Sequence, residues 1–185
     1  MRLLDVRRLG LVCAAVAVTA GMVVAGCAEQ VPGAATTDPA EVAAYKTSAA
    51  ASASAAAAAK AAAAQTKAIS DNCTQFPTTT GAGVTAFNEF VTAHDRNAPD
   101  YADKREAAAT TLDNAATKVE SGVTAAVGAL PADLAEKFTA YVVAARELSA
   151  ETRKMTYSSQ VTRLNDASRK INQARTAVHD ACPSR

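Results

Sequence analysis

The sequence predicts an all-α protein, an up-and-down bundle of about four helices. Alanine provides 48 of the 185 residues, and alanine is the strongest helix former and a poor strand former. Large apolar residues are few, but those present, together with small residues, follow a three-and-four spacing over 101–129 and 132–181, the spacing of a buried helical face. The charges nearly cancel, with 19 basic and 18 acidic residues, which excludes a strongly basic nucleic-acid binder.

The first predicted helix begins at Asp38 and runs to about Ser70. Asp38 suits the capping position, Pro39 the first helical position and Glu41 completes a capping box. Within it, residues 49–64 are alanine apart from two serines and one lysine, so the helix has almost no large apolar face. Two interpretations stay open: a stalk, or a bundle helix that packs closely through alanine.

A loop is predicted over 73–83, because Pro77, Gly81 and Gly83 interrupt the pattern. A second helix is expected over 84–97, followed by a turn in which Asp100 can cap the next helix. The third helix is expected over 101–129. Its seam of mostly small residues comprises Tyr101, Arg105, Ala108, Leu112, Ala115, Val119, Gly122 and Ala126.

The last helical region spans 132–181 and carries two seams. The first contains Leu134, Phe138, Tyr141, Ala145, Leu148, Thr152 and Met155. The second contains Tyr157, Val161, Leu164, Ser168, Ile171, Arg175, Val178 and Cys182. The phase slips between them near 156–159, which indicates either a kink or a turn between two helices.

The N-terminal segment has the organisation of a secretory signal. Arg2, Arg7 and Arg8 precede an uncharged run that extends to Val24 and is slightly short for a membrane span. The run ends in Val24-Ala25-Gly26-Cys27. These four residues resemble the lipobox of bacterial lipoproteins, and with the alanine-rich composition the chain resembles the small alanine-rich envelope lipoproteins of actinobacteria, including mycobacteria.

The resemblance implies that the signal peptide, 1–26, is removed and that Cys27 carries the lipid. Two or three acyl chains are enough for stable attachment to a membrane. The expected location is the extracytoplasmic face of the bacterial cell membrane. A tether over 27–37 would then lead to a helical domain over 38–185.

The cysteine inventory follows from this assignment. Cys13 leaves with the signal peptide and Cys27 is used by the lipid, so Cys73 and Cys182 remain. In an oxidising compartment an even pair predicts a disulfide, which would make the bundle disulfide-closed. His179 lies three residues before Cys182, so a metal site is kept as a weaker alternative; no metal or cofactor is expected.

No catalytic motif is found, and an enzyme is not expected. The stretch Gly81-Ala82-Gly83-Val84-Thr85-Ala86 fits a loose dinucleotide-binding pattern, but that pattern functions between a strand and a helix, and no strand is predicted. The two histidines, His94 and His179, have no nucleophile beside them. His94 is interpreted as a partly buried residue of a helix face.

Two functions remain. The first is a non-catalytic, lipid-anchored envelope protein with a structural or interaction role, its partner an envelope protein or polymer and not a nucleic acid. The alternative is a carrier of a small apolar ligand, lipid or haem, in a cavity lined by Phe87, Phe90, Phe138 and Tyr141. Basic residues near the C-terminus could contact an anionic surface or instead pair with acidic helices of the same chain: Arg153, Lys154, Arg163, Arg169 and Lys170.

Overall fold

The structure is a computed structural model that describes residues 38–183. The chain divides into two units, residues 1–42 and 43–185, and the bundle belongs to the second. The predicted signal peptide over 1–26, the tether over 27–37 and the lipid attachment site Cys27 lie outside the described residues.

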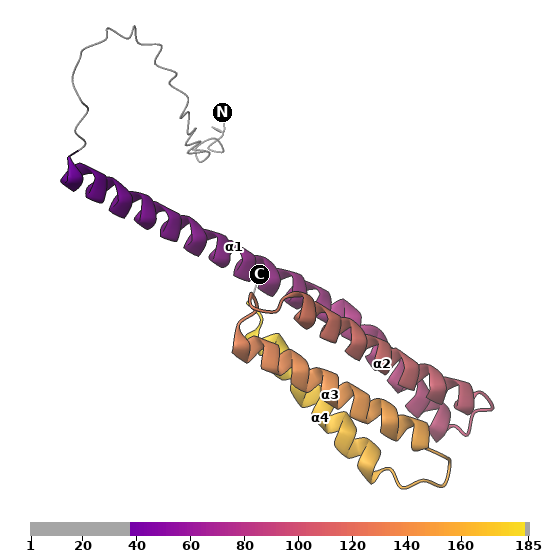
Figure 1. Cartoon of the computed structure of the whole chain (residues 1–185). Helices are drawn as coiled ribbons and strands as arrows, with labels where there is room; N and C mark the ends of the chain where they lie inside the picture. The colour runs from indigo at the N-terminus through magenta and orange to yellow at the C-terminus, as the bar shows by residue number, and fades with distance from the viewer. Residues whose placement is uncertain (1–37, 184–185) are drawn as a thin grey trace, which may run out of the picture. The chain divides into compact units, whose positions relative to one another are not determined.

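The described part of the chain consists of four helices and contains no strand. They are α1 (Pro39–Asp95), α2 (Tyr101–Ala125), α3 (Ala132–Lys154) and α4 (Thr162–Ala181). Short connections join them, so successive helices run in opposite directions (Figure 1). The predicted all-α, up-and-down bundle is confirmed.

The loop predicted over 73–83 is wrong, because α1 continues through it and joins the two helices expected over 39–70 and 84–97. Pro77 lies inside the helix on its exposed side. Gly83 is buried, and a Cβ at this position would lie 3.2 Å from Cδ2 of Leu112. The glycine therefore lies where α1 approaches Leu112 of α2 closely, and it does not mark a turn.

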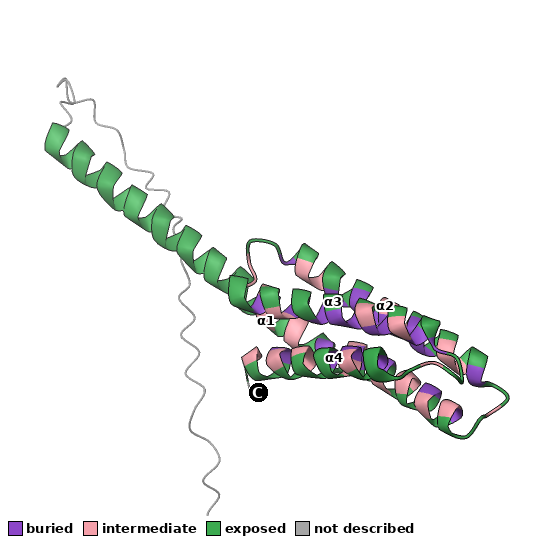
Figure 2. Ribbon diagram, turned by 90° about the horizontal axis from the view of Figure 1, so that it is seen from below, coloured by how far each residue is buried: buried purple, intermediate pink, exposed green. Residues whose placement is uncertain are grey.

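The two parts of α1 differ in burial. Every residue from 38 to 67 is exposed, and the first buried residue is Ala68 (Figure 2). From there α1 has a buried face comprising Ala68, Phe76, Thr80, Gly83, Phe90 and Ala93. A single helix thus combines the two alternatives, an exposed segment followed by a bundle helix.

The seams predicted for α2 and α3 are largely confirmed. Five of the eight residues expected in the α2 seam are buried within the helix, and Arg105 and Gly122 are half-buried. Ala126 is also buried, although α2 ends at Ala125. All seven residues of the α3 seam are buried, including Met155 directly after the helix.

The region 132–181 forms two helices, separated by residues 155–161. The start of the second seam is therefore wrong: Tyr157 and Val161 are exposed, and burial in α4 begins at Leu164. The Tyr157 hydroxyl instead donates a hydrogen bond to the carbonyl oxygen of Ala98 at 2.7 Å. This bond joins the α3–α4 connection to the turn between α1 and α2.

Only one of the two proposed carboxylate caps forms. The backbone N–H of Ala40 donates to Oδ1 of Asp38 at 2.8 Å. Asp100 precedes α2, but its side chain makes no capping hydrogen bond.

Candidate functional site

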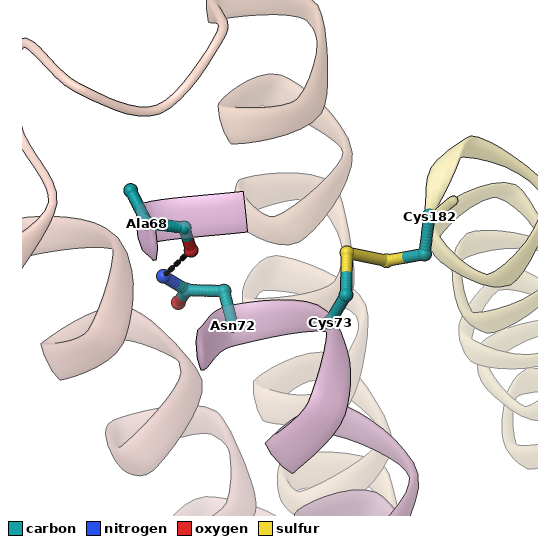
Figure 3. Close-up of a disulfide and its surroundings, with 4 residues drawn as sticks. All are labelled: Ala68, Asn72, Cys73 and Cys182. Carbon is teal, nitrogen blue, oxygen red and sulfur yellow. Dashed lines mark hydrogen bonds between the residues drawn. A yellow bond between two sulfur atoms is a disulfide. The ribbon is translucent and has the colours of Figure 1, made fainter. Parts of the chain in front are cut away.

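The predicted disulfide joins the first and the last helix of the bundle, α1 and α4. Cys73 lies in α1 and Cys182 directly follows α4; their sulfur atoms are bonded at 2.03 Å and their Cα atoms are 5.7 Å apart (Figure 3). Next to Cys73, Asn72 donates from Nδ2 to the carbonyl oxygen of Ala68 at 2.9 Å. The disulfide therefore fixes the end of α4 close to the point where burial begins along α1. It also removes the predicted metal alternative, because Cys182 has no free thiolate.

A cavity of about 80 Å³ lies between α1 and α4. Its deepest residues are contributed by α2 and α3, where Leu112, Tyr141 and Leu148 are each at most 2% exposed. The remaining lining residues are Thr80, Gly83, Val84, Phe87 and Asn88 from α1 and Ser168, Ile171, Asn172 and Arg175 from α4.

The four aromatic residues expected to line one cavity are divided between several places. Phe87 and Tyr141 line this cavity, whereas Phe138 borders a separate groove between α1 and α2. Phe90 lies under Phe87, at a ring-centroid distance of 5.8 Å, and is 1% exposed. The structure thus brings two of the four to a common enclosed space.

Several polar side chains in the cavity have no protein partner. Among residues 38–183, the side chains of Thr80, Tyr141, Ser168 and Arg175 form no hydrogen bond or ion pair. Burial raises the pKa of Tyr141 to about 12, and the positive charge of Arg175 partly opposes that rise. The phenol is therefore a protonated donor at physiological pH.

Ser168 and Arg175 were predicted from the sequence as residues of a helix seam, whereas in the structure they line the cavity. The signal was present in the pattern, because a serine and an arginine seven residues apart occupy positions where a core would have apolar side chains. Thr80 was missed because it fell in the stretch interpreted as a loop.

The basic residue Arg153 is part of an intramolecular network at the protein surface. Its Nη1 atom donates to Asp113 at 2.7 Å and to Oγ of Ser149 at 2.8 Å, and its Nε lies 3.3 Å from Glu106. Ser149 is fully buried and donates to the carbonyl oxygen of Ala109 at 2.9 Å. These bonds connect α3 with α2, and the carboxylates raise the pKa of Arg153.

Three of the other four basic residues proposed for an anionic surface also pair with carboxylates. Lys154, Arg169 and Lys170 bond Glu151, Asp166 and Glu147, respectively. The Lys170 pair joins α4 to α3, whereas the other two lie within one helix. Among the residues that the structure describes, Arg163 forms no ion pair. Contact with an anionic surface stays a prediction.

A second polar cluster lies at the end of the bundle opposite the disulfide. His94 is half-buried, as predicted, and its ring lies 5.6 Å from that of Tyr101. Nε2 of His94, the hydroxyl of Tyr101 and Nε of Arg105 are buried without a hydrogen-bond partner. Arg105 does use Nη1, which donates to the carbonyl oxygen of Met155 at 3.0 Å. No group of side chains within 38–183 has the composition and proximity to hold a metal ion.

The fold and the disulfide define the class of protein: a disulfide-closed four-helix bundle. A family model described as the Rv2240c four-helix bundle domain matches residues 54–183, and the chain belongs to that family. The mycobacterial name of the family fits the resemblance to actinobacterial proteins. No curated protein and no solved structure matches the chain. In the part of the chain covered by the structure, no helix combines the length and the hydropathy needed to cross a membrane.

Proposed function

We propose that this protein is a non-catalytic lipoprotein of the cell envelope, anchored through Cys27, whose bundle serves a structural or interaction role outside the membrane. The observation that carries the proposal is the use of its cysteines. Cys73 and Cys182 are bonded to each other, and Cys27 is the remaining cysteine after Cys13 leaves with the signal.

The disulfide supports the location. Disulfides persist in oxidising compartments and are rare in the bacterial cytoplasm. A bond that joins α1 to the end of α4 would be lost in a reducing compartment, and with it the covalent closure of a bundle that has few large apolar residues. The disulfide therefore also supports export of the protein from the cytoplasm. The N-terminal segment that ends in the lipobox-like residues would direct that export.

The exposed part of α1 supports a role in presenting the bundle. Residues 43–67 are helical and exposed throughout, and 25 residues at 1.5 Å each span roughly 37 Å. A segment of this kind between a lipid anchor and the bundle would act as a stiff spacer. Alanine suits it, since a helix without packing neighbours depends on intrinsic propensity.

The arrangement of charged groups supports a non-catalytic role. The carboxylates of Glu106, Asp113, Glu120 and Glu147 are paired with arginine or lysine. The cavity between α1 and α4 is not lined by any carboxylate. General acid–base catalysis by a carboxylate requires that group within reach of a bound substrate, and these carboxylates are instead paired on the protein surface.

The carrier of lipid or haem stays a prediction. The cavity between α1 and α4, about 80 Å³, is smaller than the roughly 300–1,000 Å³ pockets that hold drug-sized ligands. The groove between α1 and α2 that Phe138 borders is about 620 Å³, so a carrier of such ligands would use this groove and not the smaller cavity.

The lipid anchor can be tested by metabolic labelling with an alkyne fatty acid in an actinobacterial host. The full chain should incorporate the label and partition into the detergent phase. Cys27→Ala should abolish both, whereas Cys13→Ala, a matched change inside the signal, should leave both intact. Equal labelling of the Cys27→Ala protein and the parent would overturn the proposal.

A further inference from the structure

The cavity between α1 and α4 contains more hydrogen-bonding capacity than the protein itself uses. Tyr141 is 99% buried and lines this cavity, yet its hydroxyl has no partner within residues 38–183. Thr80, 3% exposed, adds a second hydroxyl without a partner. Buried polar groups are nearly always hydrogen-bonded, so this gathering points to a ligand.

From this arrangement we propose that the cavity binds a small organic anion, a short-chain carboxylate, with its carboxylate group between Arg175 and Tyr141 and its carbon chain against apolar walls. The proposal goes beyond the envelope role above and does not depend on the lipid anchor. It assigns a chemical class of ligand to one defined place in the bundle.

The charge of the residues that line the cavity indicates whether the ligand is an anion or a cation. Arg175 is the single charged residue among those that line the cavity, and it forms no ion pair with the described part of the chain. A guanidinium binds a carboxylate with two parallel hydrogen bonds. With its pKa raised to about 12, Tyr141 stays protonated and can donate a further bond. A cation would be repelled by Arg175, because no carboxylate lines the cavity to offset that charge.

The apolar walls and the volume of the cavity limit the size of the ligand. Leu112, Leu148 and Ile171 are buried and line the cavity. A cavity of about 150 Å³ holds benzene, which has six non-hydrogen atoms, and one water occupies about 30 Å³ of liquid. On that scale the volume of about 80 Å³ holds about three or four non-hydrogen atoms, the size of formate or acetate.

The positions of the exposed residues indicate the entrance. Asn88 on α1 and Asn172 on α4 are exposed, and Arg175 is half-buried. A ligand can thus enter between the two helices. The disulfide connects the same two helices, which limits how far the entrance can widen.

Saturation-transfer difference NMR tests the assignment on the full chain purified in a non-ionic detergent. Straight-chain acids from formate to octanoate are titrated, with acetamide as the neutral counterpart of acetate. We expect acetate to bind best, with a dissociation constant of about 1 mM, and acetamide at least about tenfold more weakly. Equal affinity for the acid and the amide, no saturation transfer to any short acid, or preference for octanoate would each overturn the proposal.

Variants locate the site. Arg175→Gln should weaken acetate binding at least about tenfold and Tyr141→Phe severalfold. Arg175→Lys keeps the positive charge but not the two parallel hydrogen bonds, so it should weaken binding measurably but by less than Arg175→Gln. Arg163→Gln is the matched control, because Arg163 is an exposed arginine of the same helix outside the cavity. Circular dichroism identifies any variant that fails to fold. Should folded Arg175→Gln and Arg175→Lys both bind as the parent does, the carboxylate lies elsewhere and the assignment is wrong.

Discussion

Cys182, the first residue after the last helix, is bonded to Cys73 in the interior of the first helix, 109 residues earlier in the chain. The bond lies five residues beyond Ala68, the first buried residue of α1. It therefore closes the bundle at the end from which the exposed part of α1 departs. At the opposite end, the bond from Tyr157 to the carbonyl oxygen of Ala98 joins the two connections.

Reduction of the disulfide should destabilise the bundle strongly. In the chain-entropy model a closed loop of this length contributes roughly 4–5 kcal/mol, and the core is built largely from alanine and few large apolar side chains. We expect the melting temperature, followed by circular dichroism, to fall by about 10–20 °C on reduction. The Cys73→Ser/Cys182→Ser protein should melt at the lowered temperature and should not respond to reductant. A melt of the parent that is unchanged by reductant contradicts this role of the bond.

Replacing Pro77 should stabilise the protein. Pro77 lies inside α1, where it cannot donate to the carbonyl of Cys73, and proline costs about 3 kcal/mol relative to alanine in a helix interior. We expect Pro77→Ala to raise the free energy of unfolding by about 1–3 kcal/mol. Pro131→Ala, directly before α3, is the control and should give no such gain. A loss of stability in Pro77→Ala would indicate that 73–83 is a loop after all.

Two glycines of α1 should respond differently to the same substitution. Gly81 has no atom within 4 Å of an added Cβ, whereas at Gly83 the Cβ would lie 3.2 Å from Leu112. Gly81→Ala should stabilise by about 0.5–1 kcal/mol. Gly83→Ala should give less, because Leu112 must move. Chemical denaturation of the two variants measures the difference, and an equal gain from both would mean that α1 and α2 are not in close contact at Gly83.

Stability at high pH should depend on Tyr141. Its pKa is about 12 in the folded protein and about 10 in an unfolded chain. The protonated phenol is therefore favoured by folding, and its contribution is complete below pH 10 and lost as the pH rises towards 12. We expect the free energy of unfolding to fall over this interval by up to about 2 kcal/mol more in the parent than in Tyr141→Phe. Tyr45→Phe, at a site 74% exposed, should behave like the parent.

The spacing of apolar residues correctly predicted the helices that are buried along one face over their whole length. The seam from Leu134 to Met155 is buried at every expected position, because five of its seven residues are large and apolar and the three-and-four spacing is unbroken. The cysteine pair was also predictable, since the expected signal peptide and lipid attachment account for Cys13 and Cys27 and leave two cysteines. In these regions local propensity and the tertiary contacts favour the same structure.

The helical structure of residues 73–83 could not be predicted from the sequence. Contacts with other helices stabilise it, against the local preference of the proline and glycines for a turn. Proline and glycine usually mark turns. In this bundle Gly83 is selected by the proximity of Leu112, a contact between residues distant in sequence. Burial of Phe76 and Thr80 on the same face stabilises the helix around Pro77, so tertiary packing overrides the local preference. The cavity was hidden for a similar reason, because its lining comes from all four helices.

The most direct measurement is the intact mass of the full-length gene product extracted from the membranes of an actinobacterial host. We expect a chain that begins at Cys27, carries a diacylglycerol on that cysteine, and gains the mass of two hydrogens when Cys73 and Cys182 are reduced. A chain that retains residues 1–26, or one with an unmodified Cys27, would contradict the assignment of this protein as a lipid-anchored, disulfide-closed bundle of the cell envelope.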